Sequence, residues 1–218
     1  MITVEHVSKR YEGGITALRD VNFQLARGEM VFLTGHSGAG KSTLLRLVLM
    51  LERPSGGKIT VNGQELCRTP ARHAARTRQR IGMIFQDHKL LKNKSVFDNV
   101  ALPLMIAGLP YREVRKRVRA ALDRVGLLGR EATAPGRLSG GEQQRVGIAR
   151  AIVGMPPVLL ADEPTGNLDH KTGADILRIL RRLNADENLT IVMVTHDLAI
   201  ADQADCTVRL VEGQVKAA

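Results

Sequence analysis

The sequence predicts an α/β fold in which helices cover a mainly parallel sheet. Short apolar runs at residues 30–34, 158–161 and 190–194 are typical of buried strands, a helical pattern separates the last two, and a glycine-rich turn follows the first. Strands that alternate with helices along the chain form parallel, helix-covered sheets. With 218 residues, 44% hydrophobic and 25% charged, the chain can bury a substantial core, which argues against disorder.

The first third of the chain is predicted to hold most of the strands. Residues 2–7 and 21–25 alternate between apolar and polar side chains, which indicates strands with one solvent-facing side, whereas residues 30–34 are continuously apolar. Residues 41–51, with Arg46 as their only interior charge, predict a mostly buried helix. Two more strands are predicted at 58–63 and 81–85. Just before the second of these, residues 68–80 contain arginines and no acid.

Residues 86–156 are predicted to be mainly helical. Val114, Val118, Leu122 and Val125 recur every three or four positions with basic residues between them, so one helix face is packed and the other is charged. Further on, we predict strands at 158–161, 190–194 and 207–211, and a helix over 171–183. The sequence contains no internal repeat or flexible linker, so the helical stretch is interpreted as an insert in one α/β chain.

The charge balance predicts an anionic partner. The net charge is +10, and nucleotides, nucleic acids and lipid head groups all fit it. Aromatic residues make up only 3%, which argues against binding of single-stranded RNA by base stacking. Cys67 and Cys206 form no metal or redox motif, so free thiols in a reducing compartment are expected. No export signal and no membrane span are predicted, and any work at a membrane requires a partner.

The turn at residues 35–43 carries the strongest chemical signal. It matches GxxxxGK[ST] and lies between a predicted strand and a predicted helix, which is the context that the motif requires. Glycines allow successive N–H groups to point at one anion, Lys41 adds a positive charge, and the Ser42 hydroxyl suits Mg²⁺. A plain glycine-rich turn is the alternative, which this context disfavours. The candidate phosphate-binding residues are Gly35, His36, Ser37, Gly38, Ala39, Gly40, Lys41, Ser42 and Thr43.

A second candidate is the acidic pair that ends the apolar run at 158–161. Ligands of open α/β sheets gather at the carboxyl ends of the strands, so Asp162 and Glu163 are expected beside the phosphate loop. Asp162 suits the shell of a Mg²⁺ ion, and Glu163 suits the orientation or deprotonation of an attacking water. Taken alone, two solvated acids are the simpler interpretation, but a phosphate loop in the same chain reverses that preference.

A third candidate precedes the helical run at 146–153. Ser139 can cap this helix, and Gly140 and Gly141 permit close approach, so the exposed N–H groups form a second anion site. A capping box of Ser139 with Glu142 explains those two residues about as well. It does not explain the paired glycines, which weaken a helix unless something must come close.

The order and spacing of these motifs resemble the nucleotide-binding subunit of an ABC ATPase over essentially the whole chain. The matching segments are 35–43, Gln86, 138–143, Asp162 with Glu163, 166–169 and His196. The resemblance implies one domain, residues 1–218, with a P-loop NTPase (RecA-like) core, an antiparallel β subdomain and an inserted α-helical signature subdomain. Residues 1–86 and 157–218 are expected to form the catalytic core with the β subdomain, and residues 87–156 the helical subdomain.

The resemblance also implies an ATPase with ATP and Mg²⁺ as cofactors, working as an ATP-dependent head-to-tail homodimer. Each ATP is expected between Lys41 with Ser42 of one copy and Ser139 with Gly141 of the other. An isolated phosphate loop leaves the outer phosphate half solvated, and electrostatic catalysis favours donors on all sides.

The remaining site residues follow from the same resemblance. His196 is expected to contact the γ-phosphate and the water held by Glu163, Gln86 to sense Mg²⁺, and Tyr11 to stack on adenine. Asp169 is expected to contact the partner copy rather than a metal. On sequence alone, a structural His196 and a half-buried Tyr11 stay open as alternatives. The expected catalytic residues are Glu163, His196, Lys41 and Gln86, and the expected metal ligands are Ser42, Gln86 and Asp162.

Segments 28–30, 34–40, 82–88 and 96–104 resemble the cell-division members of the family most. This resemblance implies that the chain lies at the cytoplasmic face of the bacterial inner membrane, at the division septum, bound to an integral membrane partner. ATP-driven conformational change is then expected to regulate peptidoglycan hydrolysis on the other side of the membrane. The docking groove is expected within residues 86–104, and the basic surplus favours an anionic lipid surface by about 1 kcal/mol per basic residue. The apolar residues of the expected docking groove are Leu90, Leu91, Val96 and Phe97, and lysines lie between them.

Other functions compete with this one. Lipoprotein-releasing and macrolide-export ABC ATPases share residues 163–169, so they remain the alternative. A DNA-acting cassette fits the positive charge, but the stretch between Gln86 and Ser139 is too short for coiled-coil arms, and no specific nucleic acid is expected. A phosphate-loop kinase is predicted to have an acceptor site where residues 139–142 stand, so the signature argues against this class.

Overall fold

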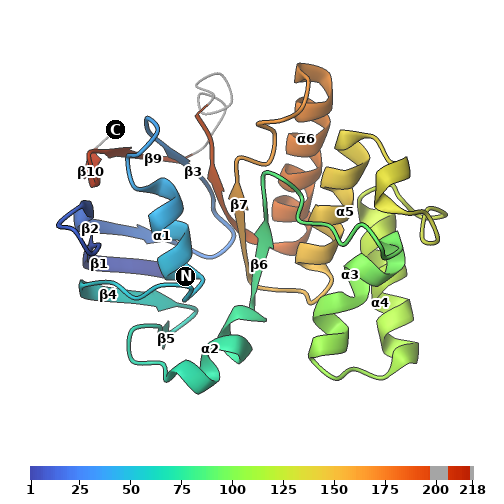
Figure 1. Ribbon diagram of the computed structural model, residues 1–218, viewed down its shortest axis with the longest axis horizontal. Helices are drawn as coiled ribbons and strands as arrows, with labels where there is room; N and C mark the ends of the chain where they lie inside the picture. Colours follow the sequence, from blue (N-terminus) through green and yellow to red (C-terminus); the bar gives the residue numbers. More distant parts are fainter. Residues whose placement is uncertain (197–205, 217–218) are drawn as a thin grey trace.

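The structure is a computed structural model, and it describes residues 1–196 and 206–216. A parallel sheet runs through the middle, an antiparallel sheet lies on one side of it, and a group of helices lies on the other (Figure 1). The predicted α/β class is confirmed, with its antiparallel sheet and its helical insert. Among the described residues, no helix is both long enough and apolar enough to cross a bilayer.

The central sheet has the order β10-β9-β3-β8-β7-β6, and all neighbours are parallel except β10 and β9. The parallel order places the carboxyl ends of β3, β6, β7 and β8 along one edge, where ligands bind in such sheets. The strands are β3 (Met30–Thr34), β6 (Ile81–Ile84), β7 (Val158–Asp162), β8 (Thr190–Val194), β9 (Cys206–Val211) and β10 (Gln214–Lys216).

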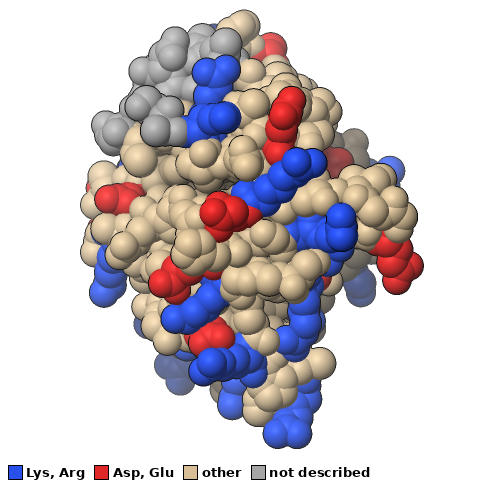
Figure 2. Space-filling view, turned by 90° about the vertical axis from the view of Figure 1, so that its left-hand side faces the viewer, with Lys and Arg blue, Asp and Glu red and all other residues tan. Residues whose placement is uncertain are grey.

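The second sheet is antiparallel and has the order β2-β1-β4-β5. Its strands are β1 (Ile2–Arg10), β2 (Thr16–Leu25), β4 (Gly56–Val61) and β5 (Gln64–Glu65). Figure 2 shows this side of the molecule, where basic side chains alternate with acidic ones and gather toward the lower end. The lower end in Figure 1 contains α2 (Ala71–Arg78), which belongs to the arginine-rich stretch.

The predicted helical insert is confirmed. It consists of α3 (Val96–Ile106), α4 (Tyr111–Arg124), the short 3-10 helix η1 (Pro135–Arg137) and α5 (Gly140–Ile152). Outside it, α1 (Lys41–Val48) is shorter than predicted, because the chain turns at Met50 with φ 53°. The helix α6 (His170–Glu187) is longer, and α2 was not predicted because only Ala74 and Thr77 of its residues are buried.

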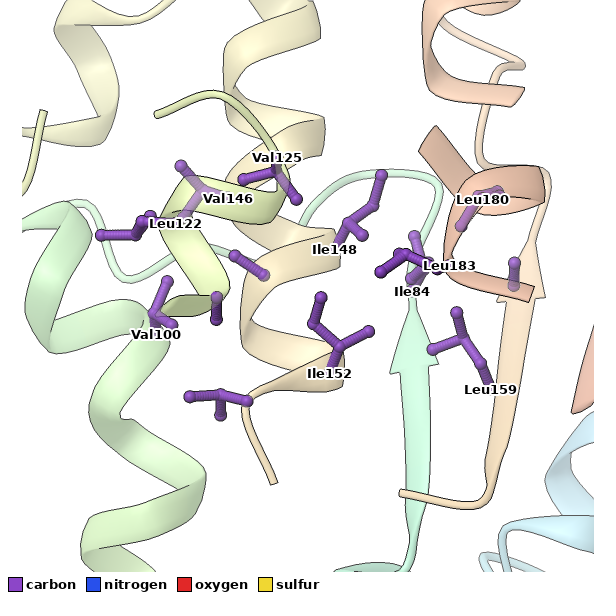
Figure 3. Close-up of a cluster of buried hydrophobic side chains, with 14 of the residues drawn as sticks. Ile84, Val100, Leu122, Val125, Val146, Ile148, Ile152, Leu159, Leu180 and Leu183 are labelled. Carbon is purple, nitrogen blue, oxygen red and sulfur yellow. The ribbon is translucent and has the colours of Figure 1, made fainter. Parts of the chain in front are cut away.

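The central sheet divides the hydrophobic core in two. In β3, Met30 and Phe32 pack with the helices α3 to α6, whereas Val31 and Leu33 pack with α1 and the antiparallel sheet. This division follows from the two-residue period of a strand, which sends neighbouring side chains to opposite faces. Figure 3 shows how Ile148 and Ile152 of α5 lie between the helices and the strands β6 and β7. The helix α5 therefore packs the rest of the helical insert against the strands β6 and β7.

Candidate functional site

The glycine-rich loop joins the end of β3 to the first turn of α1. Gly35, Gly38 and Gly40 have φ values of 146°, 79° and 103°, which other residues rarely adopt. A Cβ atom on Gly35 would lie 2.2 Å from the Leu210 carbonyl oxygen, so the sheet itself requires glycine there. Gly40 is the N-cap of α1, and no side chain caps the helix. The N-terminal N–H groups are therefore available to an anion.

Lys41 lies folded over this loop. Its Nζ donates to the carbonyl oxygens of Gly35, at 2.7 Å, and His36, at 2.9 Å, and the residue is only 8% exposed. A nearly buried ammonium beside an uncapped helix N-terminus is a strongly electropositive combination. This donor set fits a polyphosphate, as the sequence predicts.

The loop opens onto a cleft of about 390 Å³. The structure thus brings most of the predicted phosphate loop, the predicted base Glu163 and His196 to one place, whereas Gly35, His36 and Ala39 do not line the cleft. The cleft is lined by Ala17, Ser37, Gly38, Gly40, Lys41, Ser42, Thr43, Glu163 and His196.

Glu163 leaves β7 in a left-handed conformation, with φ 47°. Its N–H donates to the Val194 carbonyl oxygen at 3.1 Å, and its Oε1 lies 3.2 Å from Nδ1 of His196. The Glu163 side chain is 22% exposed and the His196 side chain 64%. The pairing supports a base oriented by histidine at the mouth of the cleft.

Asp162, the last residue of β7, is the partly buried acid of the pair. Burial raises the pKa of its carboxyl group, the charge of Glu163 raises it further, and Lys41 and Arg46 oppose both effects. A carboxylate that is poorly compensated in the ligand-free protein fits a divalent cation. Mg²⁺ keeps several waters and needs only one or two carboxylates, so Asp162 with Ser42 is a suitable donor set. Within the described residues, no cluster of three or more His, Cys, Asp or Glu offers another metal site.

Gln86 follows β6 and is exposed. Its Nε2 lies 3.5 Å from Oδ1 of Asn167, and Nδ2 of Asn167 lies 3.4 Å from the Gln86 carbonyl oxygen. These long contacts connect Gln86 to the loop after Glu163. The predicted role of Gln86 toward Mg²⁺ stays a prediction.

Tyr11 and Asp169 occupy different sides of the site. The Tyr11 hydroxyl lies 3.3 Å from Oγ1 of Thr43, and Lys9 Nζ lies 5.0 Å from the centre of its ring. Tyr11 thus lies half-buried beside the phosphate loop, and its predicted stacking on adenine stays a prediction. Asp169 is the exposed N-cap of α6, and its two oxygens accept from the N–H and hydroxyl of Thr172, which lowers the pKa of its carboxyl group. Its predicted contact with a partner copy stays a prediction.

Ser139 caps α5 in a capping box with Glu142, the alternative that the sequence left open. Its Oγ accepts from the Glu142 N–H at 3.2 Å, and Glu142 Oε2 accepts from the Ser139 N–H at 2.9 Å, which completes a capping box. These bonds, with Arg130 and Arg145 nearby, lower the pKa of the Glu142 carboxyl group. One of the paired glycines has an explanation within the chain: a Cβ on Gly141 would lie 2.4 Å from Cγ2 of Thr172, whereas a Cβ on Gly140 would lie 3.5 Å from Cδ2 of Leu168, an ordinary contact.

Ser139, Gly141 and Glu142 line a separate cleft of about 380 Å³ between α5 and α6, whose lining contains no phosphate-loop residue. The two predicted phosphate sites of one chain thus face different clefts. Sequence analysis missed Thr172, which shapes this cleft, and Gln144, whose buried amide reaches Pro164. Both lie within or next to the motifs, but their partners are distant in sequence, so no local pattern could identify their contacts.

Comparison with known proteins is consistent with this geometry. Residues 18–166 match the family described as ABC transporter. The cell division ATP-binding protein FtsE of Escherichia coli K12 is 57% identical over 198 residues, which cover 91% of this chain and 89% of that protein. The protein of the same name from Mycobacterium tuberculosis is 47% identical over 203 residues, covering 93% and 88%.

A solved structure of the ATP-binding cassette MJ0796, a dimer in a post-hydrolysis state bound to ADP and Pi, is also similar. The TM-score is 0.90 and the sequence identity 36%, and the alignment covers 100% of this chain and 97% of that one.

We expect Gly141→Ala to lower the free energy of unfolding by about 1–3 kcal/mol, because the new Cβ meets Thr172. Thr172 cannot turn aside without breaking its 2.6 Å bond to Asp169. Thr172→Ser removes Cγ2 and keeps the hydroxyl, so Gly141→Ala should be close to neutral in that background. Urea unfolding of the four proteins measures the difference. An equal loss in both backgrounds would contradict the proposed contact.

We expect Asp162→Asn to raise the free energy of unfolding at pH 7 in the absence of Mg²⁺ and nucleotide. A folded-state pKa above the usual value of 3.8 means that the folded chain binds the proton more tightly, so wild-type stability falls as the pH rises through these two values. The advantage of Asn should disappear below about pH 3, where the carboxyl group is protonated in both the folded and the unfolded wild type. Urea unfolding across pH measures it, and a gain that persists in acid would contradict the cause.

Proposed function

This chain belongs to the ABC transporter family, whose ATP-binding cassettes are ATPases, and from that premise we propose that it is the Mg²⁺-dependent ATPase subunit of a cell-division complex. The observation that carries the ATPase assignment is the cleft where Lys41, Ser42 and Glu163 meet. The cell-division assignment rests on the 57% identity to FtsE of Escherichia coli K12.

We propose that Lys41 and the N–H groups of the loop bind the outer phosphates. Ser42 and Asp162 would hold Mg²⁺, which would supply positive charge to those phosphates. Glu163 accepts a proton from the attacking water, and His196 orients the Glu163 carboxylate, since their atoms lie 3.2 Å apart. The capped N-terminus of α5 keeps Ser139 oriented. Gln86 contacts Asn167, so a change in the turn after Glu163 is passed to the segment that follows β6.

The complete site requires two copies. The phosphate loop and Ser139 line separate clefts of one chain, so a γ-phosphate on Lys41 lacks donors on its open side. We propose that a second copy, related head to tail, supplies Ser139 and Gly141, and that Asp169 lies at this contact. The dimeric MJ0796 structure, 36% identical, supports the arrangement. We propose that the helical part moves relative to the catalytic part. The helical part is residues 87–156, and the catalytic part is residues 1–86 and 157–218.

We propose FtsX, an integral membrane protein, as the partner, which places the chain at the cytoplasmic face of the inner membrane at the division septum. ATP-driven change would then regulate septal peptidoglycan hydrolysis across the membrane. Of the apolar residues expected in the docking groove, Leu91 is 42% exposed, and Leu90 and Phe97 are half-buried. Val96 is fully buried in the core, so it cannot contact a partner and the expectation for it was wrong. The basic surplus is proposed to add attraction to anionic lipid.

We expect Glu163→Gln to reduce ATP turnover by at least about 10²-fold and to accumulate an ATP-bound dimer, because binding proceeds and hydrolysis does not. Light scattering after size exclusion, with and without ATP, measures the mass. Lys41→Ala is the control, and it should abolish both nucleotide binding and dimerisation. A Glu163→Gln protein that stays monomeric at saturating ATP would contradict the shared site.

We expect vesicles that contain FtsX to bind the chain more tightly than protein-free vesicles of the same anionic lipid. Leu91→Asp should weaken binding to the FtsX vesicles alone, because it places a charge in the proposed groove. Leu128→Asp is the matched control, since Leu128 is 48% exposed and lies outside residues 86–104. Co-sedimentation measures binding, and equal binding to both kinds of vesicle would count against this partner.

A further inference from the structure

The side chain of Gln144 connects two loops that are far apart in the sequence. It projects from α5, is 0% exposed, and its Nε2 donates to the Pro164 carbonyl oxygen at 2.8 Å. Its Oε1 forms a hydrogen bond with Nδ1 of His88, in the loop after β6. One buried amide is therefore bonded at one end to the loop at 86–89 and at the other to the turn that follows Glu163.

The orientation of this amide is fixed by its partners. A carbonyl oxygen only accepts, so the NH₂ group must face Pro164 and the amide oxygen must face His88. His88 must then donate from Nδ1, which requires a hydrogen on that nitrogen. A residue at position 88 that only accepts hydrogen bonds cannot replace it.

The loop that carries His88 is held in a strained shape. His88 and Lys89 have φ values of 58° and 48°, in the left-handed region that disfavours side chains. Arg150, also on α5, donates to the carbonyl oxygens of both, at 2.6 Å and 2.7 Å. Gln144 and Arg150 of α5 therefore hold the loop in one defined position, and displacement of the loop breaks these bonds.

The Pro164 carbonyl lies in the turn that orients Glu163. The N–H of Glu163 donates to Val194, and the N–H of Gly166 donates to the Glu163 carbonyl oxygen at 3.1 Å. The bond from Gln144 to Pro164 attaches this turn to α5. Removing it frees the turn to rotate and alters the distance between the Glu163 carboxylate and the cleft.

We propose that Gln144 is a positioning residue for Glu163, and that it holds Glu163 in place only while His88 donates to it. Displacement of His88 then lowers hydrolysis through Gln144 and the turn that follows Glu163, independently of the role predicted for Gln86 toward Mg²⁺. The Gln86 to Asn167 contact is a parallel link between the same loops. This inference rests on the proposed function, since it takes Glu163 as the base.

The decisive comparison is His88→Asn against His88→Asp. The two side chains have the same shape and both tolerate a left-handed backbone, but only Asn can donate to Gln144. We expect His88→Asp to lower kcat for ATP about tenfold, equivalent to about 1.4 kcal/mol, with KM within about twofold. His88→Asn should retain kcat within about twofold. Equal activity of the two variants overturns the proposal.

Gln144→Leu keeps the volume of the side chain and removes both bonds, so it should lower kcat as much as His88→Asp. Gln64→Leu is the matched control, because the Gln64 amide donates to Thr69 and Thr77 beside the antiparallel sheet, away from the site. It should lower stability and leave kcat within about twofold. A Gln144→Leu protein with normal kcat overturns the proposal.

Hydrogen exchange of the ligand-free full chain tests the link without activity. His88→Asp and Gln144→Leu should increase amide exchange in residues 163–168 about tenfold, and His88→Asn should not. Unchanged exchange there overturns the link between His88 and the turn. If exchange responds but Glu163→Gln hydrolyses ATP normally, the link stands and the proposed function of Glu163 fails instead.

Discussion

The structure depends on an uncapped helix N-terminus held at the end of a buried strand. The helix α1 begins at Gly40 with no side-chain cap, and Lys41 lies nearly buried over the same loop. Both features create positive potential at the loop, which the Asp162 carboxyl group offsets only in part, so an anionic ligand is favourable there. The loop keeps this shape because Leu210 of β9 packs against it so closely that Gly35 admits no Cβ. Phosphate binding is thus built into the packing of the sheet.

Other unfavourable features gather around the same edge of the sheet. Burial raises the pKa of Asp162. Glu163, His88 and Lys89 have left-handed backbones, and each such conformation costs about 1–3 kcal/mol. The surrounding core offsets these terms, because α5 packs against both the helical insert and the strands β6 and β7. The same helix carries Ser139, Gln144 and Arg150. Movement of the insert relative to the sheet therefore affects the signature serine and the loops around Glu163 together.

The glycines of the signature illustrate how one residue can meet two demands. Gly141 cannot carry a Cβ because Thr172 of α6 lies against it, whereas a Cβ at Gly140 would only make an ordinary contact with Leu168. Packing within the chain therefore accounts for glycine at position 141, whether or not the nucleotide of a second copy approaches this helix start as proposed. The capping box of Ser139 and Glu142 likewise serves helix stability and the orientation of the serine at once.

The sequence by itself determined the fold class, most strands and the phosphate loop, because these follow from local periodicity and from glycines at fixed spacing. It also placed Asp162 and Glu163 beside that loop, since strand ends share one edge of a parallel sheet. It could not predict α2, the burial of Val96, or the contacts of Gln144 with His88 and Pro164. Those depend on which surfaces meet when α5 packs between the insert and the sheet. Only the tertiary structure decides such contacts, because their partners are distant in the chain and leave no local pattern.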